Sequence, residues 1–536
     1  MLHTARSFNA MAVTPHRLAS QSAAAVLREG GNAVEAAIAA AAALCVVYPH
    51  MTGLGGDCFW LIRPAGAKAP LAVSSAGASA ALASHAWYVE QGCDAVPTRG
   101  PLACVTCAGA VAGWRAALEV AAAWEGGVNN ISRLFADAVA YAREGFAVSD
   151  LQSAMTRAAL GNLADAPGFA AAFLDDGRAP APGSRMRLPA LARTFERLAE
   201  EGLDSFYHGP LAKDIAKDLE ATGAPLRLGD LEAHEAVTGP PLALRLDGAT
   251  AYNTPPPTQG VASLMILGIL ERYLRRCKPD LTQAHELVHA VVEATKRAFL
   301  LRDERVADPA YMRCNVQDLL DGGLLDDLAL RISPEKALPW PKEQESAGDT
   351  VWFGVIDRYG NAVSCIQSVY HEFGSGVVLP ATGIAWHNRG LGFQFAPGHP
   401  NSLGPRKKPF HTLNPAMALF DDGRIMTYGT MGGEGQPQTQ AAVFTRAVTL
   451  GEPLQRALCE PRWLLGRAWG DQSSRLRLEA DFPASCFERL KAMGHDIEKT
   501  PARSSLMGHA GAIVRHANGL LEGGFDPRGD GAVGCL

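Results

Sequence analysis

The feature that most constrains this chain is a threonine that opens an apolar, strand-like segment deep inside the sequence. Thr350 follows residues 339–348, a polar stretch with breakers, and precedes residues 351–357, whose pattern is typical of a strand. Turn residues at 357–361 then lead into a second apolar run at 362–366, which is a hairpin signal. An ordinary hairpin with a threonine at the strand start is the simplest interpretation.

The other interpretation makes Thr350 a nucleophile. A threonine hydroxyl attacks an amide only when a base takes its proton, and the α-amino group of the same residue, with a solution pKa of about 8, can be that base. Thr350 has such an amine only after the Asp349–Thr350 bond is cut. Residues 339–348 have the composition of an exposed, cleavable connection. On this interpretation the chain is a precursor of a large fragment, residues 1–349, and a small fragment, residues 350–536.

Short motifs along nearly the whole chain favour the second interpretation. They are GGNAVEA at 30–36, PHMTGLGG at 49–56, GAVAG at 109–113, AREGF at 142–146, FYHG at 206–209, TPPP at 254–257, FGSG at 373–376, KKP at 407–409 and MGG at 431–433. In this order and spacing they resemble the gamma-glutamyltransferase family of N-terminal-nucleophile hydrolases. The resemblance implies an α/β (α+β) fold, a four-layer αββα sandwich, whereas periodicity alone supports only a mixed α/β chain.

The resemblance also assigns expected roles to single residues. It implies that Thr350 attacks both its own peptide bond and the substrate, and that the Ser368 hydroxyl hydrogen-bonds this nucleophile. The backbone N–H groups of Gly432 and Gly433 are expected to form an oxyanion hole, because glycine lets the backbone come close to the substrate. A plain turn at the two glycines and a solvent-facing hydroxyl at Ser368 are the alternatives.

The substrate anchors of the family are changed in this chain. The family holds the α-carboxylate and α-ammonium of a gamma-glutamyl group with an arginine and an acidic residue. Here residues 73–78 contain no cation, and the acidic pair of the family's NNQMDDF-like segment has become Leu391 and Gly392. Removing the partner of a desolvated charge costs roughly 2–5 kcal/mol. Glutathione and other gamma-glutamyl amides, whether hydrolysed or used for transfer, are therefore the alternative substrates and not the favoured ones.

The same segment gains Arg389, which favours a different substrate. Arginine can bind a carboxylate with two donors, so a small acid amide without an α-amino group would fit, and oxamate is the smallest such molecule. Surface exposure of Arg389 is the alternative. The other candidate substrate-binding residues are Asn388, Tyr370, His411 and Thr412. Residues 348–352 and 368–374 are also similar to the oxamate amidohydrolase branch of the family, which belongs to purine-nitrogen catabolism.

Composition narrows the partners and the compartment. A net charge of -6 and a pI near 6.2 give no sign of nucleic-acid binding, and the alanine-rich run 36–48 is too short for a membrane span. Residues 1–10 lack the apolar core of a secretory signal, and eleven cysteines, an odd number, favour reduced thiols. We expect a cytoplasmic enzyme with a small-molecule partner and no metal or organic cofactor. Its two fragments stay together as a heterodimer, which could pair into a dimer of heterodimers.

Two interpretations of other classes remain open. His285, Glu286 and His289 form an HExxH pattern, which on a helix can bind zinc, with Glu293 or Glu304 as a third ligand. The pattern is short enough to arise by chance in 536 residues. A catalytically silent relative that keeps only the fold is the other alternative, and failure to self-cleave would support it.

Periodicity predicts the main elements. Helices are expected at 22–28, 33–44, 211–220 and 283–302, and the region after Thr350 is expected to be rich in strands. The expected strands are 351–357, 362–369, 415–420 and 425–429, with helices at 452–458 and 484–493 packed on the outside.

Overall fold

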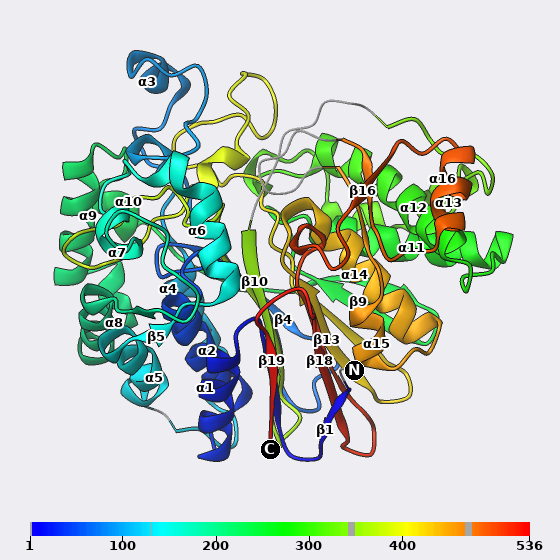
Figure 1. Cartoon of the computed structure of the whole chain (residues 1–536), viewed down its shortest axis with the longest axis horizontal. Coiled ribbons are helices and arrows are strands. Elements are labelled where there is room, and N and C mark those ends of the chain that lie inside the picture. Colours follow the sequence, from blue (N-terminus) through cyan, green and yellow to red (C-terminus); the bar gives the residue numbers. More distant parts are fainter. Residues whose placement is uncertain (1–2, 129, 341–348, 467–473) are drawn as a thin grey trace.

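The centre of the molecule consists of two seven-stranded antiparallel sheets that face each other (Figure 1). The computed structural model describes residues 3–128, 130–340 and 349–536 except 467–473, and at Asp349 it describes the backbone alone. In spatial order, sheet I consists of β19 (Ala532–Cys535), β2 (Met11–Thr14), β10 (Asp349–Ile356), β11 (Ala362–Tyr370), β3 (Asp57–Arg63), β4 (Leu71–Ser75) and β7 (Val237–Gly239). Sheet II consists of β1 (Ala5–Ser7), β18 (Leu521–Phe525), β17 (Ala510–Arg515), β13 (Ile425–Thr430), β12 (Ala416–Phe420), β9 (Ala249–Asn253) and β8 (Leu242–Leu246).

Both sheets contain strands from before and from after residue 350. In sheet I, β10 pairs with β2 on one side and with β11 on the other, and β11 in turn pairs with β3. In sheet II, β12 pairs with β9, and β1 pairs with β18. The expectation that strands concentrate after Thr350 was therefore incomplete, because the earlier part of the chain supplies half of the strands in the two large sheets. A cut before Thr350 would leave two interleaved fragments.

Helices cover the outer face of each sheet, which confirms the four-layer αββα sandwich (Figure 1). The layer on sheet I contains α1 (Arg17–Arg28), α2 (Ala33–Val47), α4 (Ala110–Ala121), α5 (Ile131–Glu144) and α8 (Pro189–Glu201), with α3 (His85–Glu90), α6 (Asp150–Leu163), α7 (Phe169–Phe173), α9 (Pro210–Thr222) and α10 (Leu228–Glu232) around them. The layer on sheet II contains α11 (Gly260–Cys277), α12 (Ala284–Arg305), α13 (Gly322–Leu330), α14 (Gln436–Phe444), α15 (Leu454–Cys459) and α16 (Ala484–Ala492). Two smaller sheets lie outside the sandwich, β14 (Trp463–Leu465) with β15 (Leu476–Glu479) and β16 (Ile497–Thr500), and β5 (Phe146–Ala147) with β6 (Arg185–Met186).

The alanine-rich run is a buried helix, as the sequence predicts. All residues of α2 are buried, and the helix contacts β10 and β11 of sheet I. Asn32 caps its first turn, and Glu35 completes a capping box by accepting the Asn32 N–H. Small side chains let this helix lie close to the strands that carry Thr350 and Ser368.

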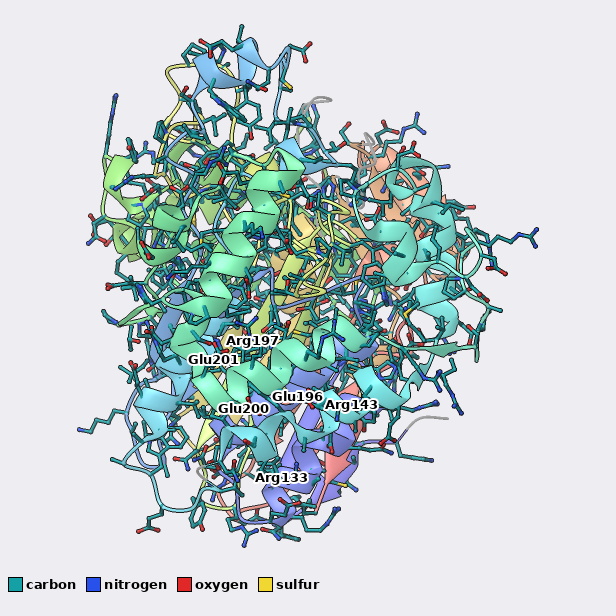
Figure 2. All side chains as sticks on the ribbon, turned by 90° about the vertical axis from the view of Figure 1, so that its left-hand side faces the viewer. Arg133, Arg143, Glu196, Arg197, Glu200 and Glu201 are labelled. Atoms are coloured by element: carbon teal, nitrogen blue, oxygen red, sulfur yellow. The ribbon has the colours of Figure 1, made fainter. Side chains whose placement is uncertain are left out.

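The outer surface of the first helical layer carries charges of both signs. Figure 2 faces this layer and shows Arg143 of α5 beside Glu196 of α8, with Arg197, Glu200 and Glu201 on the same helix. Arg197 Nε lies 3.0 Å from Glu201 Oε1. Exposed ion pairs of this kind contribute about 0–1 kcal/mol each to the free energy of unfolding, so they add little to the stability of the fold.

The space between the two sheets is filled by apolar side chains, and one of them sets how the sheets align. Trp352 of β10 packs directly on Gly429 of β13 and Gly511 of β17, where any side chain would overlap its indole ring. Two residues further along β10, a Cβ at Gly354 would lie 2.9 Å from Thr427 Oγ1. The facing strands β10 and β13 therefore run in opposite directions, and the start of β10 lies over the end of β13.

The predicted elements agree with the structure apart from their ends. The helix expected from residue 452 begins as α15 at Leu454, because Pro453 occupies the N-cap. The strand expected from residue 351 begins two residues earlier, at Asp349. All eleven cysteines are free thiols. Among the residues described, no helix has both the length and the apolar character needed to cross a membrane.

Candidate active site

Thr350 and Ser368 lie side by side on neighbouring strands of sheet I. Both are buried, and the Thr350 hydroxyl donates a hydrogen bond to Ser368 Oγ at 3.3 Å. The register between β10 and β11 shifts between Asp349 and Val351, so Thr350 occupies an irregular position in its strand. Such irregularities redirect a side chain and recur next to active sites. The structure thus brings together the predicted nucleophile and its predicted partner.

The strand that carries Ser368 ends in a residue with an unusual backbone. Tyr370 has a φ of 80°, in the left-handed region that residues other than glycine rarely adopt, and its N–H donates to Ser368 Oγ at 2.8 Å. A conformation of this kind costs about 1–3 kcal/mol and persists only where the surroundings hold it. It places the phenol ring against Arg389, whose Cζ lies 3.5 Å from the ring centroid.

Arg389 is buried, which excludes the surface alternative. It begins the short helix η5 (Arg389–Gly392), and its Nη1 donates to Thr412 Oγ1 at 3.3 Å. Nε and Nη2, which share another edge of the guanidinium, have no hydrogen-bond partner among the described residues. A Cβ at Gly392 would lie 2.6 Å from Nη2 and 3.2 Å from Nε, so only glycine fits against this edge. Two adjacent N–H donors match the two oxygens of a carboxylate.

A buried carboxylate lies in the same row of sheet I. Asp57 is the register partner of Ser368 on the neighbouring strand β3, and it is fully buried. Its Oδ1 accepts the N–H groups of Gly77 and Gly109, each at 3.0 Å. Its Oδ2 lies 3.1 Å from His411 Nε2 and 3.5 Å from His387 Nδ1.

Burial sets the charge state of this cluster. Burial alone would raise the pKa of Asp57, but His387, His411 and the Gly77 N–H more than offset it and hold the pKa below its ordinary value. Burial, helped by the positive charge of Arg389, lowers the pKa of His411 to about 4. Burial also lowers the pKa of Arg389, against the opposing effects of Tyr370 and Asp57, yet an arginine stays charged in a protein. The wall of the site thus contains one cation, one anion and two neutral imidazoles.

The glycine pair lies at the same end of the two sheets as Thr350. Gly432 and Gly433 lie just after β13, separated from it by Met431, and have φ values of 113° and 53°, which only glycine adopts without strain. Because the start of β10 lies over the end of β13, these backbone groups and Thr350 belong to the same region. The Gln259 side chain donates to both Gly433 O and Thr412 O, at 2.9 and 2.8 Å, and so joins the glycine turn to the segment that contacts Arg389.

Asn388 occupies its side chain with backbone groups. Its Nδ2 donates to Thr98 O at 2.9 Å, and its Oδ1 accepts the His371 N–H at 3.1 Å. Asn388 therefore fixes the segment before Arg389. Within the segment without a cation, residues 73–78, Gly77 has no room for a side chain, because a Cβ there would overlap the Cys107 carbonyl.

The HExxH pattern forms a different cluster. His289, Glu293 and His495 bring their ligand atoms within 4.8 Å of one another, and His285 is not part of this group. The Glu293 carboxylate already accepts hydrogen bonds from Lys296 and Arg297, each at 2.8 Å. Two buried cations beside the carboxylate oppose a divalent metal ion, so the cluster favours an ion-paired anchor of α12 over a metallopeptidase centre.

Sequence reasoning missed Asp57, His387 and Gln259. A signal for Asp57 was present, since an acidic residue directly after a glycine loop and directly before the apolar run 58–62 contradicts the pattern of a buried strand. His387 and Gln259 carried no such signal, because their contacts depend on segments far away in the chain.

Several known proteins are similar to this chain over nearly its whole length. The family model described as Gamma-glutamyltranspeptidase matches residues 19–536. The chain is 53% identical to an oxamate amidohydrolase proenzyme of Klebsiella pneumoniae subsp. pneumoniae, over 98% of each chain. It is 41% identical to a glutathione hydrolase-like proenzyme of Bacillus subtilis, also over 98% of each chain. The crystal structure of cephalosporin acylase from Bacillus halodurans superimposes with a TM-score of 0.89 at 30% identity, covering 100% of this chain and 97% of that one.

Proposed function

The chain belongs to the gamma-glutamyltranspeptidase family, and from this premise we propose that it is a self-processing amidohydrolase that hydrolyses small acid amides of the oxamate type through Thr350. The observation that carries the substrate class is the buried guanidinium of Arg389, whose Nε and Nη2 have no partner among the described residues. A buried cation with two free donors is costly unless a ligand supplies the partner.

Self-processing begins with the Thr350 hydroxyl, which attacks the carbonyl carbon of Asp349. The resulting ester is cut by water, which leaves residues 1–349 with a new carboxylate and residues 350–536 with a free amine on Thr350. Both sheets contain strands of both fragments, so the fragments remain associated without a covalent link. This interleaving supports a heterodimer as the working form.

Substrate hydrolysis uses the same hydroxyl. The Thr350 amine takes the hydroxyl proton as Oγ1 attacks the amide carbon, and Ser368 Oγ stays within hydrogen-bond reach of the nucleophile. The N–H groups of Gly432 and Gly433 stabilise the negative oxygen of the tetrahedral intermediate. The amine then returns the proton to the leaving nitrogen, and ammonia departs. Water attacks the acyl ester in the same way, so that oxamate and water yield oxalate and ammonium.

Arg389 selects the acid end of the substrate. Its stacking on Tyr370 and its bond to Thr412 hold the guanidinium in one orientation, so little freedom is lost when a carboxylate binds. The relative that is named an oxamate amidohydrolase proenzyme supports a two-carbon acid amide. A gamma-glutamyl group would also need an anion for its ammonium, and the family's acidic pair is replaced by Leu391 and Gly392.

Two measurements test the proposal. N-terminal sequencing of the smaller band on a denaturing gel is expected to begin at Thr350, and Thr350→Ala is expected to leave one intact, inactive chain. Ammonia release is expected to be faster from oxamate than from a gamma-glutamyl amide at equal concentration. An intact wild-type chain, or a preference for the gamma-glutamyl amide, contradicts the proposal.

A further inference from the structure

The hydrogen-bond pattern of His387 leaves one ring nitrogen, Nδ1, able to bind a further proton. His387 Nε2 lies 2.9 Å from the Thr106 carbonyl oxygen and 3.1 Å from the Thr106 hydroxyl oxygen. A carbonyl can only accept and a hydroxyl can also accept, so both contacts are satisfied when this nitrogen carries the hydrogen of the neutral ring. The other nitrogen, Nδ1, then has a lone pair, yet it lies 3.5 Å from the carboxylate oxygen Oδ2 of Asp57 and has no hydrogen-bond partner among the described residues. A lone pair beside a carboxylate is unfavourable, and a proton between them would form a charge-assisted hydrogen bond.

His411 does not offer such a nitrogen. Its Nδ1 lies 3.4 Å from the Leu413 N–H, which is a donor, and its Nε2 lies 3.1 Å from Asp57 Oδ2, which is an acceptor. The neutral ring with its hydrogen on Nε2 satisfies both contacts. In the neutral state, therefore, both ring nitrogens of His411 have hydrogen-bond partners, whereas Nδ1 of His387 has none among the described residues.

The charge balance of the site indicates when His387 Nδ1 would gain a proton. Without substrate, Arg389 and Asp57 cancel, and both imidazoles are neutral. A substrate carboxylate on Arg389 adds a negative charge to a buried region, and such a region favours a compensating proton. His387 lies two residues before Arg389 in the same segment, and the charge of Arg389 acts on its pKa. We propose that the Asp57–His387 pair takes up one proton from solvent when a substrate carboxylate binds Arg389, which makes Asp57 a specificity determinant for anionic substrates.

The pKa shifts agree with this direction. Burial lowers the pKa of His387, Asp57 opposes that effect, and Arg389 adds to it. A bound carboxylate cancels the contribution of Arg389, so the His387 pKa rises in the complex. Between the lower free value and the higher bound value, the ring is protonated only in the complex. Affinity for an anion is therefore highest at low pH and falls as pH rises through this window, which begins below the ordinary histidine value of about 6.5.

The other side chains around the pair do not take up this proton, and the Asp57→Asn variant below distinguishes the pair from the Thr350 amine of the processed enzyme. The titratable or charged groups that act on Asp57 or His387 from neighbouring elements are His411, Arg389, His234, Cys58, Cys107 and Tyr207. Burial raises the pKa of both thiols and of the Tyr207 phenol, so all three stay neutral up to pH 8. Burial lowers the pKa of His234 to about 4, and this ring contacts the Ser75 hydroxyl at 3.3 Å.

The experiment measures proton uptake by the processed wild-type enzyme. The inference rests on the proposed function, so the probe is oxalate, the expected product, which the enzyme cannot hydrolyse further and which stays ionised from pH 5.5 to 8. Calorimetric titrations in two buffers with different ionisation heats give the number of protons taken up at each pH. We expect a maximum of about one proton, with the oxalate dissociation constant rising up to about tenfold per pH unit in that window.

Two variants assign the proton. In Asp57→Asn the amide N–H can donate to His387 Nδ1 without a proton from solvent, so proton uptake should vanish and oxalate affinity should become independent of pH. His234→Asn is the matched control, because it removes an equally buried histidine that is not bonded to Asp57, and uptake should persist.

The outcomes separate the inference from the proposed function. Oxalate binding without proton uptake at every pH overturns the inference alone, and uptake that survives in Asp57→Asn overturns the assignment to this pair. Failure of wild-type enzyme to bind oxalate or to hydrolyse oxamate overturns the substrate class and the inference together. If Asp57→Asn does not fold or self-cleave, the wild-type titration still tests the inference, because zero proton uptake there shows that oxalate binding is not coupled to protonation.

Discussion

Replacing Arg389 by methionine tests the carboxylate anchor most directly. Methionine has a similar length and no charge, so it removes the two N–H donors of the guanidinium while it retains much of the packing on Tyr370. Truncating one partner of a buried, hydrogen-bonded charge pair costs about 2–5 kcal/mol. At 1.4 kcal/mol per factor of ten, kcat/KM for oxamate should fall by about 30-fold to about 4,000-fold.

Two comparisons make this result specific to the carboxylate. Arg389→Lys keeps the charge but loses the two-donor edge, so it should recover only part of the loss. Oxamide has the same scissile amide as oxamate but no carboxylate, so its turnover should change much less than that of oxamate. Coupled ammonia release gives both rates, and a denaturing gel confirms that each variant is fully processed.

The reasoning is refuted if fully processed Arg389→Met hydrolyses oxamate within threefold of wild type. It is also refuted if oxamate and oxamide lose the same factor, because that result would mean that Arg389 supports the fold of the site and does not bind the acid group.

Three other variants probe neighbouring parts of the structure. Ser368→Ala removes the partner of the Thr350 hydroxyl and should lower kcat by roughly fivefold to 150-fold, which corresponds to 1–3 kcal/mol; an unchanged kcat in steady-state assays contradicts this role. Gly392→Ala places a Cβ 2.6 Å from Arg389 Nη2 and should raise KM for oxamate more than it lowers kcat; equal changes in both constants argue for general misfolding. Glu293→Gln leaves Lys296 with a neutral partner and should lower the free energy of unfolding by about 3–5 kcal/mol in urea titrations. EDTA should have no effect on wild-type activity, and inactivation by EDTA would restore the metal interpretation.

Local pattern was sufficient for the parts of the site that belong to one strand or one turn. Thr350 and Ser368 could be placed from the hairpin and the motifs, because β10 and β11 are adjacent in sequence and their pairing follows from the turn between them. Gly432 and Gly433 could be recognised as a turn because adjacent glycines form a local signal that needs no distant segment. The buried helix α2 was predictable, since a run of small apolar residues has few other stable environments.

Long-range contacts explain what could not be predicted. Whether Arg389 lies on the surface or in the core depends on Tyr370 and Thr412, and no short window of sequence contains all three. Asp57 acquires its partners from Gly77, Gly109, His387 and His411, which four separate segments supply. The HExxH pattern failed for the complementary reason, because Lys296 and Arg297 on the same helix occupy the Glu293 carboxylate.

The sequence by itself therefore determined the family and the layered fold, and it predicted the nucleophile and the loss of the gamma-glutamyl anchors, because these depend on motif order and on residues that are absent. Only the tertiary structure decided that Arg389 is buried with a free two-donor edge beside Gly392, and that Asp57 joins two histidines behind it. The physical reason is that hydrogen bonding and charge balance in a buried site depend on distances between segments, which a linear pattern does not contain.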